Sequence, residues 1–185
     1  MSRNRKKYVI WIGALAALML IFFAAFYRLP FFSNIIPVPF IPIIERVLPQ
    51  AVFQDYAGRE IQLSDFRGNP IIINMWSSWC PYCIEELPIF SEIKKEFGEA
   101  VIILAVNRGE TKEIAERYSN EIVPGNELVF LLDPKDSFYT AVGGFSMPET
   151  LFVNTEGKII LHRRGSMQKE EIRRRIQDEF HLNYD

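Results

Sequence analysis

The hydrophobic pattern divides the chain into one long apolar run near the N-terminus and a region beyond residue 49 where short apolar runs alternate with amphipathic stretches. The first run, residues 8–27, contains twenty residues without a charge. As a helix it would be about 30 Å long, which matches the hydrocarbon layer of a bilayer. We therefore predict a transmembrane signal anchor over 8–27. A cleaved signal peptide and a buried helix of a soluble protein are the alternatives.

The residues on either side of this run predict its orientation. Four basic residues lie within residues 1–7, whereas only Arg28 follows the run before Glu45. By the positive-inside rule, residues 1–7 form a basic cytoplasmic N-terminus and the rest of the chain is extracytoplasmic. The sequence thus predicts a single-pass protein of the cell membrane that contacts the lipid bilayer through residues 8–27.

Residues 28–49 contain five prolines among phenylalanine and isoleucine residues. Proline interrupts a continuous helix, and so apolar a segment does not suit a freely solvated linker. We interpret 28–49 as a proline-rich juxtamembrane linker that lies against the membrane surface. The alternative is a segment that packs on the domain that follows it.

The region 50–185 has the size and the pattern of one α/β domain. Continuous apolar runs indicate strands buried on both faces, and shorter runs around turn residues indicate β-hairpins. The expected strands are 52–56, 60–63, 70–76, 100–106, 128–132, 150–153 and 158–162, and the expected helices are 84–97, 111–122 and 168–180. Together they predict a central sheet flanked by helices, with an N-terminal β-hairpin extension.

Composition and charge exclude some classes of partner. The net charge is −2 and 24% of the residues are charged, so we predict no nucleic-acid partner. Two arginine clusters, 163–164 and 173–175, are conspicuous, but acidic residues surround the second, and we expect a solvated helix face there. The two histidines, His162 and His181, lie far apart in the sequence, and we expect surface or capping positions for them.

The candidate chemistry lies in the only two cysteines, Cys80 and Cys83, which form one CxxC motif. A disulfide that closes so short a loop adds little stability, so we interpret the pair as a redox-active disulfide. The motif lies between an apolar strand and a helix, where the helix dipole favours a thiolate. We predict Cys80 as the nucleophile, Pro81 at the first helical position, and Cys83 as the resolving thiol. A structural zinc site would need about four ligands, and we predict no metal.

These features resemble the thioredoxin superfamily and, more narrowly, the membrane-tethered TlpA, ResA and DsbE group of cytochrome c maturation. The resemblance covers residues 49–181. It is carried by LSDFRGNPIIINMWSSWCPYC, by the spacing of Cys83, Glu86 and Pro88, by SMPETLFVN, and by the hairpin that begins at NTEGKII. It implies a thioredoxin-like fold with a central mixed sheet, and a thiol:disulfide oxidoreductase without a cofactor.

The resemblance also implies roles for residues outside the CxxC motif. Pro148 matches a cis-proline whose loop lines the substrate groove, together with Met147, and the alternative is an ordinary proline that opens a strand. Asn74 stands where thioredoxin has a buried aspartate. The resemblance therefore assigns its proton-transfer role to Glu86, although a carboxylate in the first turn of a helix can also merely complement the dipole.

The remaining groove residues implied by the resemblance surround the same motifs. They are Trp79, Pro81, Tyr82 and Glu149, the last of which follows the proline. For Trp79, ordinary packing is an equal alternative. Ser146 replaces the glycine usual in the group, and the sequence CPYC is more familiar from glutaredoxins, so the partner stays open.

The implied function is reduction of disulfides in exported proteins such as apocytochrome c, with a membrane thiol-reducing electron donor as the second partner. A disulfide-inserting oxidant of the same fold is the main alternative, because related CxxC proteins differ by about 150 mV in potential. A peroxiredoxin is disfavoured by Ser77 and Ile73 at the positions where that class has threonine and proline. A copper-binding domain of related fold is disfavoured because it would have CxxxC and a histidine after the core strand.

Overall fold

The computed structural model of the chain describes residues 17–20, 22–23, 46–125 and 127–182. They belong to two compact units, Met1–Ile44 and Glu45–Asp185. In the first unit the described residues are helical. None of the helices formed by the described residues is long and apolar enough to cross a membrane. Most of the predicted span 8–27 lies outside these residues, as does the linker up to residue 45, so both stay predictions.

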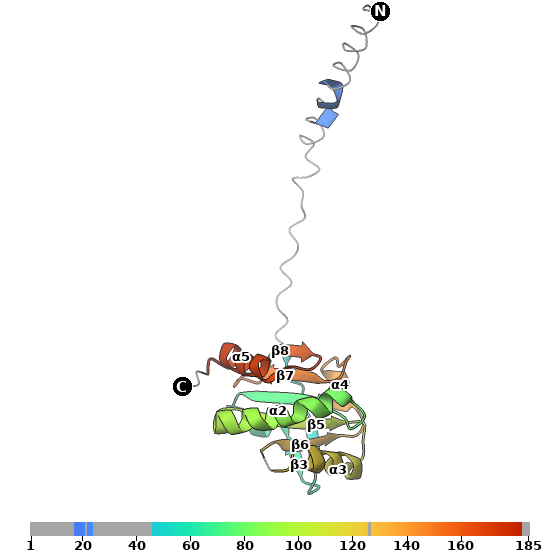
Figure 1. Cartoon of the computed structure of the whole chain (residues 1–185), viewed down its shortest axis with the longest axis vertical. Coiled ribbons are helices and arrows are strands. Elements are labelled where there is room, and N and C mark those ends of the chain that lie inside the picture. Colours follow the sequence, from blue (N-terminus) through green and yellow to red (C-terminus); the bar gives the residue numbers. More distant parts are fainter. Residues whose placement is uncertain (1–16, 21, 24–45, 126, 183–185) are drawn as a thin grey trace, which may run out of the picture. The chain divides into compact units, whose positions relative to one another are not determined.

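The second unit is built on one eight-stranded mixed sheet with the order β1-β8-β7-β4-β5-β6-β2-β3 (Figure 1). Strands β4, β5 and β6 run parallel, and the other neighbours are antiparallel. The strands are β1 (Arg46–Val47), β2 (Val52–Asp55), β3 (Glu60–Gln62), β4 (Ile71–Trp76), β5 (Ile102–Arg108), β6 (Val129–Asp133), β7 (Glu149–Val153) and β8 (Lys158–Arg164). The helices are η2 (Leu63–Phe66), α2 (Pro81–Phe97), η3 (Gly98–Ala100), α3 (Lys112–Ile122), α4 (Ser137–Ala141) and α5 (Lys169–Phe180).

Alternate side chains of the central strand β4 serve the two faces of the sheet, as the period of a strand requires. Ile72 and Trp76 pack in a core with helices α2, α3 and α5. Ile71, Ile73 and Met75 pack in a second core with α4 and the 3₁₀ helix η2. The predicted sheet with helices on both faces, and the N-terminal hairpin β2–β3, are confirmed.

Helix α2 positions the cysteines, and specific residues set where it begins and ends. Cys80 is the N-cap and Pro81 occupies the first helical position, where its missing N–H leaves no bond unmade. The helix therefore starts three residues before the predicted 84–97. Pro88 lies inside it and cannot donate to the carbonyl of Ile84. The helix ends at Phe97 and is capped by Gly98, whose φ of 55° is easily adopted by glycine.

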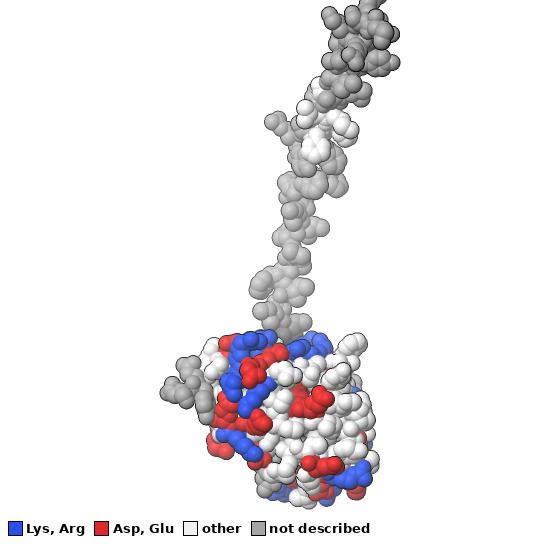
Figure 2. Space-filling view, viewed as in Figure 1, with Lys and Arg blue, Asp and Glu red and all other residues white. Residues whose placement is uncertain are grey.

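Charged side chains of both signs intersperse on the visible face, with arginine and lysine gathered near α5 (Figure 2). These cations pair with acids of α2: Lys169 Nζ lies 2.7 Å from Glu92, and Arg173 bonds to Glu96. The arginine cluster that we expected on a solvated helix face thus also ties α5 to α2. Exposed pairs of this kind add little stability each.

The first strand lies within the range that we assigned to the linker. In β1, Arg46 pairs with Ile159 and Val47 pairs with Lys158 at the edge of β8. Two residues are too few for a strand pattern to be recognised in the sequence. Sheet pairing therefore reaches back to Arg46, and the last residues of the linker range pack on the domain.

The short helix α4 was not predicted. It has five residues, too few to give a helical period. It begins where the Asp133 carboxylate accepts the backbone N–H groups of Ser137 and Phe138, at 2.9 and 3.0 Å. A buried aspartate thus satisfies the first turn in place of a local cap.

Candidate active site

The cysteine pair lies at the junction of β4 and α2, and it forms a Cys80–Cys83 disulfide. The Cys83 N–H donates to the Cys80 Sγ at 3.2 Å. Both cysteines are buried, whereas the adjoining Trp79 and Tyr82 are 61% and 62% exposed. In the reduced protein, the free N–H groups and the dipole at this helix N-terminus favour a thiolate on Cys80.

Ser77 and Ser78, between β4 and the cysteines, are hydrogen-bonded to β5 and the turn after it. Ser77 Oγ donates to the Arg108 carbonyl at 2.9 Å, and the Ser78 N–H donates to Glu110 Oε2 at 2.8 Å. Asn107 Nδ2 donates to the same oxygen at 2.7 Å. Glu110 was not predicted from the sequence, because its bonds to Ser78 span 32 positions and leave no local pattern.

Glu86 lies on the buried face of α2, three residues after Cys83, and only 1% of it is exposed. Its Oε1 accepts the Met167 N–H at 2.7 Å, and its Oε2 accepts Asn74 Nδ2 at 2.8 Å. Burial raises the pKa of Glu86 to about 7 and outweighs these two donors, which favour the carboxylate. A carboxyl with this pKa can both accept and release a proton near neutral pH.

Asn74 connects this carboxyl to the strand on the other side of β4. Its Nδ2 also donates to Thr150 Oγ1 at 3.1 Å, and the two residues are paired in the β4–β7 ladder. Asparagine has no acidic proton, so it can orient Glu86 but cannot replace it as an acid or base.

The predicted groove proline lies in the loop before β7, and the Met147–Pro148 bond is cis. Residues 143–148, called the cis-proline loop below, join α4 to β7. Met75, near the end of β4, pairs with Glu149, the first residue of β7. The cis-proline loop therefore lies beside the end of β4 that leads to the cysteines. Met147 is half-buried and packs against both cores, one of which contains Cys80 and Cys83.

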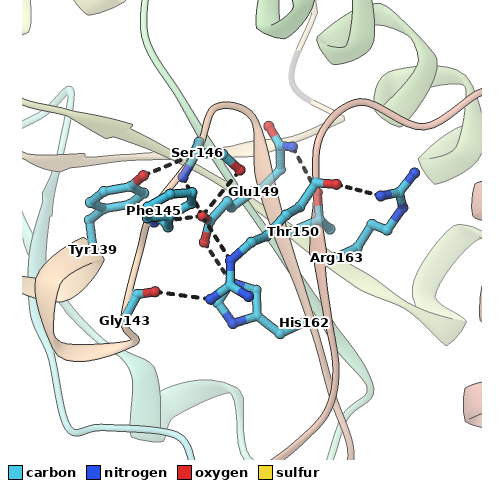
Figure 3. A network of polar contacts seen from close by, with 10 residues as sticks. Tyr139, Gly143, Phe145, Ser146, Glu149, Thr150, His162 and Arg163 are labelled. Atoms are coloured by element: carbon cyan, nitrogen blue, oxygen red, sulfur yellow. Dashed lines mark hydrogen bonds and ion pairs between the residues drawn. The ribbon is translucent and has the colours of Figure 1, made fainter.

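Glu149 occupies a different position from the groove-lining one that we expected, because it is fully buried behind the loop (Figure 3). Its Oε1 accepts the N–H groups of Phe145 at 2.7 Å and Ser146 at 2.6 Å. Its Oε2 lies 2.5 Å from His162 Nε2. Burial works against ionisation, but the two N–H donors and the histidine prevail and lower the pKa of Glu149.

The expectation of a surface or capping position for His162 was wrong. Its side chain is 8% exposed and contacts a fully buried carboxylate. Arg164, two residues further along β8, lies 3.4 Å from the same carboxylate. The signal that identifies these residues is their strand pairing with β7, which the sequence alone does not give.

The structure thus brings together two sets of predicted residues. Cys80, Cys83 and Glu86 lie at the start of α2, with Pro81 and Tyr82 exposed beside them. Met147 and buried Pro148 lie at the adjoining end of β7. Within the described part of the chain, no three histidine, cysteine or acidic side chains are placed to hold a metal ion. The arrangement is suited to thiol–disulfide exchange with a buried carboxyl at hand.

Known proteins similar to this chain include thiol-disulfide oxidoreductases. The family model described as Redoxin matches residues 45–176. The thiol-disulfide oxidoreductase ResA of Geobacillus thermodenitrificans is 32% identical over 130 residues, which cover 70% of this chain and 74% of the relative. ResA of Bacillus subtilis is 31% identical over 125 residues, which cover 67% and 69%.

Solved structures with the same fold come from several bacteria. The exposed lipoprotein thioredoxin Etrx1 of Streptococcus pneumoniae has a TM-score of 0.62 and 28% identity. The match covers 70% of this chain and 99% of that structure. A putative thiol:disulfide interchange protein DsbE of Chlorobium tepidum has a TM-score of 0.67 and covers 72% and 95%. At 22% identity, this second likeness establishes the thioredoxin-like fold alone.

Proposed function

Because the chain belongs to the Redoxin family, as a thioredoxin-like thiol-disulfide oxidoreductase of the TlpA, ResA and DsbE type, we propose that it reduces disulfides of exported proteins. The Cys80–Cys83 disulfide at the start of α2, with the buried carboxyl of Glu86 behind it, carries this proposal. Apocytochrome c is the proposed type of substrate, and a membrane thiol-reducing protein is the proposed electron donor.

Location at the cell membrane is part of the proposal. The uncharged run 8–27 supports a single-pass anchor, and the basic residues before it support a cytoplasmic N-terminus. The domain would then face an oxidising compartment, where a dithiol stays reduced only if a donor supplies electrons. This is why a membrane donor belongs to the proposal.

The reaction begins with the reduced dithiol. The Cys80 thiolate attacks one sulfur of the substrate disulfide, forms a mixed disulfide, and displaces the other substrate sulfur, which takes a proton from solvent. Cys80 is the attacking thiol because its sulfur lies at the N-cap, where N–H groups stabilise negative charge. Cys83 is wholly buried and is suited to the second, internal step.

Release of the substrate needs a thiolate at Cys83. The Glu86 carboxylate takes the Cys83 proton, the Cys83 sulfur attacks Cys80, and the second substrate sulfur leaves as a thiolate that is then protonated. Two electrons pass to the substrate, and the Cys80–Cys83 disulfide forms again. With a pKa of about 7, Glu86 is a carboxylate in a large share of molecules at neutral pH and returns the proton readily.

The substrate is held between exposed side chains at the cysteines and the cis-proline loop. Trp79 and Tyr82 offer large apolar surfaces, and Phe145 in the loop is 86% exposed. Aromatic surfaces of this kind gain binding energy when a partner covers them. Met147, within the loop, is half-buried and anchors it to both cores.

The first test is the reduction potential of the full-length chain, measured by equilibration with thiol buffers and trapping of free thiols. A value below about −250 mV is expected for a reductase. A value above about −150 mV would identify an oxidant that inserts disulfides, and would overturn the direction proposed here. Reduction of insulin by the wild-type chain, and its loss in Cys80→Ser, tests the nucleophile.

A further inference from the structure

The cis-proline loop is held from behind by side chains of three elements (Figure 3). Glu149 of β7 accepts the N–H groups of Phe145 and Ser146, and the Tyr139 hydroxyl of α4 donates to the Ser146 carbonyl at 2.8 Å. Arg164 of β8 donates to the Gly143 carbonyl at 3.2 Å. Backbone groups along the loop are therefore bonded to side chains, which restricts where the loop can lie.

Close packing adds to these bonds. A Cβ atom on Gly144 would lie 2.5 Å from the Tyr139 ring, so the loop backbone touches α4 directly. The side chain of Phe145, in contrast, is almost entirely exposed, although its N–H is bonded to Glu149. The backbone position of Phe145 thus depends on a carboxylate that is fully buried.

Glu149 in turn is held by β8. His162 Nε2 lies 2.5 Å from Oε2, and Arg164 Nε lies 3.4 Å from Oε1. His162 Nδ1 is buried and has no hydrogen-bond partner among the described residues. Its contact with Glu149 is thus the polar interaction that accounts for a histidine at this buried position.

We propose that Glu149 and His162 are positioning residues: Glu149 fixes the cis-proline loop in the geometry that binds the substrate, and His162 fixes Glu149. The inference rests on the proposed function, because the loop matters for catalysis only if it contacts a substrate. It assigns His162, a residue distant from the cysteines in the sequence, to substrate binding through another residue. It predicts an effect on substrate affinity without an effect on the reactivity of Cys80.

The test uses full-length chains with His162→Leu, which removes the donor, and His162→Gln, which keeps one. His181→Gln, at the only other histidine, is the matched control. For insulin reduction, we expect His162→Leu to raise KM by roughly tenfold, as for a lost bond to a charged group, with little change in kcat. We expect His162→Gln to recover part of the affinity and His181→Gln to match the wild type.

Two further readouts separate positioning from a general loss of structure. Alkylation of reduced Cys80 by iodoacetamide is expected to keep its rate in His162→Leu, whereas amide exchange at Phe145 and Ser146 is expected to become faster. If His162→Leu does not fold, Arg164→Gln provides the same readouts at a position where the side chain is 46% exposed, with a KM increase of roughly threefold.

The results that contradict the inference are distinct from those that contradict the function. An active His162→Leu chain with unchanged KM would overturn the positioning role, even if its melting temperature falls. Slower alkylation of Cys80 by the same factor as the change in kcat/KM would also overturn it. A wild-type chain that cannot reduce insulin would overturn the proposed function, and this inference with it.

Discussion

Two equally buried carboxyl groups support the two halves of the site, and they are tuned in opposite directions. Glu86, 1% exposed, lies beneath the dithiol and accepts one backbone and one amide N–H. Glu149, fully buried beneath the cis-proline loop, accepts two backbone N–H groups and contacts His162 and Arg164. The pKa of Glu86 is raised to about 7, whereas the pKa of Glu149 is lowered.

The difference shows that burial alone does not decide the charge of a carboxyl group. Burial raises both pKa values, and the number of donors and nearby cations determines whether it prevails. A group that titrates near neutral pH suits proton transfer to and from a thiol. A group that stays ionised suits a permanent contact, and the loop that it holds can then keep one geometry over a wide pH range.

The same substitution at both positions tests this contrast most severely. At pH 7, Glu149→Gln should lower the free energy of unfolding by about 3 kcal/mol, because weaker neutral hydrogen bonds replace those that the buried carboxylate accepts from the N–H groups of Phe145 and Ser146. Glu86→Gln should instead raise it by up to about 3 kcal/mol, since wild-type Glu86 loses its proton on unfolding at this pH whereas glutamine stays neutral in both states. Urea unfolding of the oxidised chains measures both, and equal losses would contradict the contrast.

The pH dependence of stability is the next largest expected effect. The pKa of Glu86 is about 7 in the folded chain against an ordinary value of 4.5, so the carboxyl holds its proton more tightly in the folded than in the unfolded chain. The resulting stabilisation is complete below pH 4.5 and is lost as the pH rises through 7, a change of about 3 kcal/mol. Urea unfolding of the wild type and Glu86→Gln from pH 4.5 to 8 checks this.

Glu149 affects stability in the opposite direction and in another pH window. Because its pKa is lowered, its contribution is present above the ordinary value of 4.5 and is lost at more acidic pH. The two effects are therefore separable. If the Glu86→Gln chain lost as much stability between pH 4.5 and 8 as the wild type, another group would be responsible.

Proton transfer by Glu86 predicts a kinetic effect. In Glu86→Gln, release of the substrate from the mixed disulfide at pH 7 should slow by about 100-fold, because no general base serves Cys83. Stopped-flow measurement of mixed-disulfide decay gives this rate. Exposed Glu85 supplies the control, and Glu85→Gln should keep the wild-type rate. An unchanged rate in Glu86→Gln would restrict Glu86 to a structural role.

The smallest expected effect concerns Arg164, which shares Glu149 with His162. Its side chain is 46% exposed, so Arg164→Gln should lower the free energy of unfolding by less than about 1 kcal/mol. The shift of the urea midpoint measures this. A loss as large as that of Glu149→Gln would identify Arg164, and not the histidine, as the main partner of the carboxylate.

The elements and the cysteine chemistry could be predicted because their signals are local. Long apolar runs predicted the central strands, and the CxxC motif between a strand and a helix predicted where the dithiol lies. Pairs such as Asn74 with Thr150 could not be predicted, because they depend on strand neighbours 76 positions apart. Glu86 was identified through the resemblance, and its burial and donors became visible only in the structure.

The contact between Glu149 and His162 shows why the remainder was missed. Val153 pairs with Ile159, and counting outward from that pair would put Glu149 opposite Arg163, with His162 on the other face. An irregularity between Phe152 and Val153 shifts the register by one, so Glu149 pairs with Arg164 and shares its face with His162. The sequence contains no pattern from which this register shift could be predicted.

The pairing of β4 with β7 also has a consequence for the order in which the protein becomes competent. The cysteines follow β4, but their partner loop precedes a strand 76 residues later, and β7 is itself covered by β8. During synthesis, a chain that ends before Arg164 would already carry both thiols without a groove to select what they react with. Pairing of β4 with β7 therefore separates a nonselective dithiol from a finished enzyme. We expect this pairing to be a late step, because strands far apart in the sequence meet slowly.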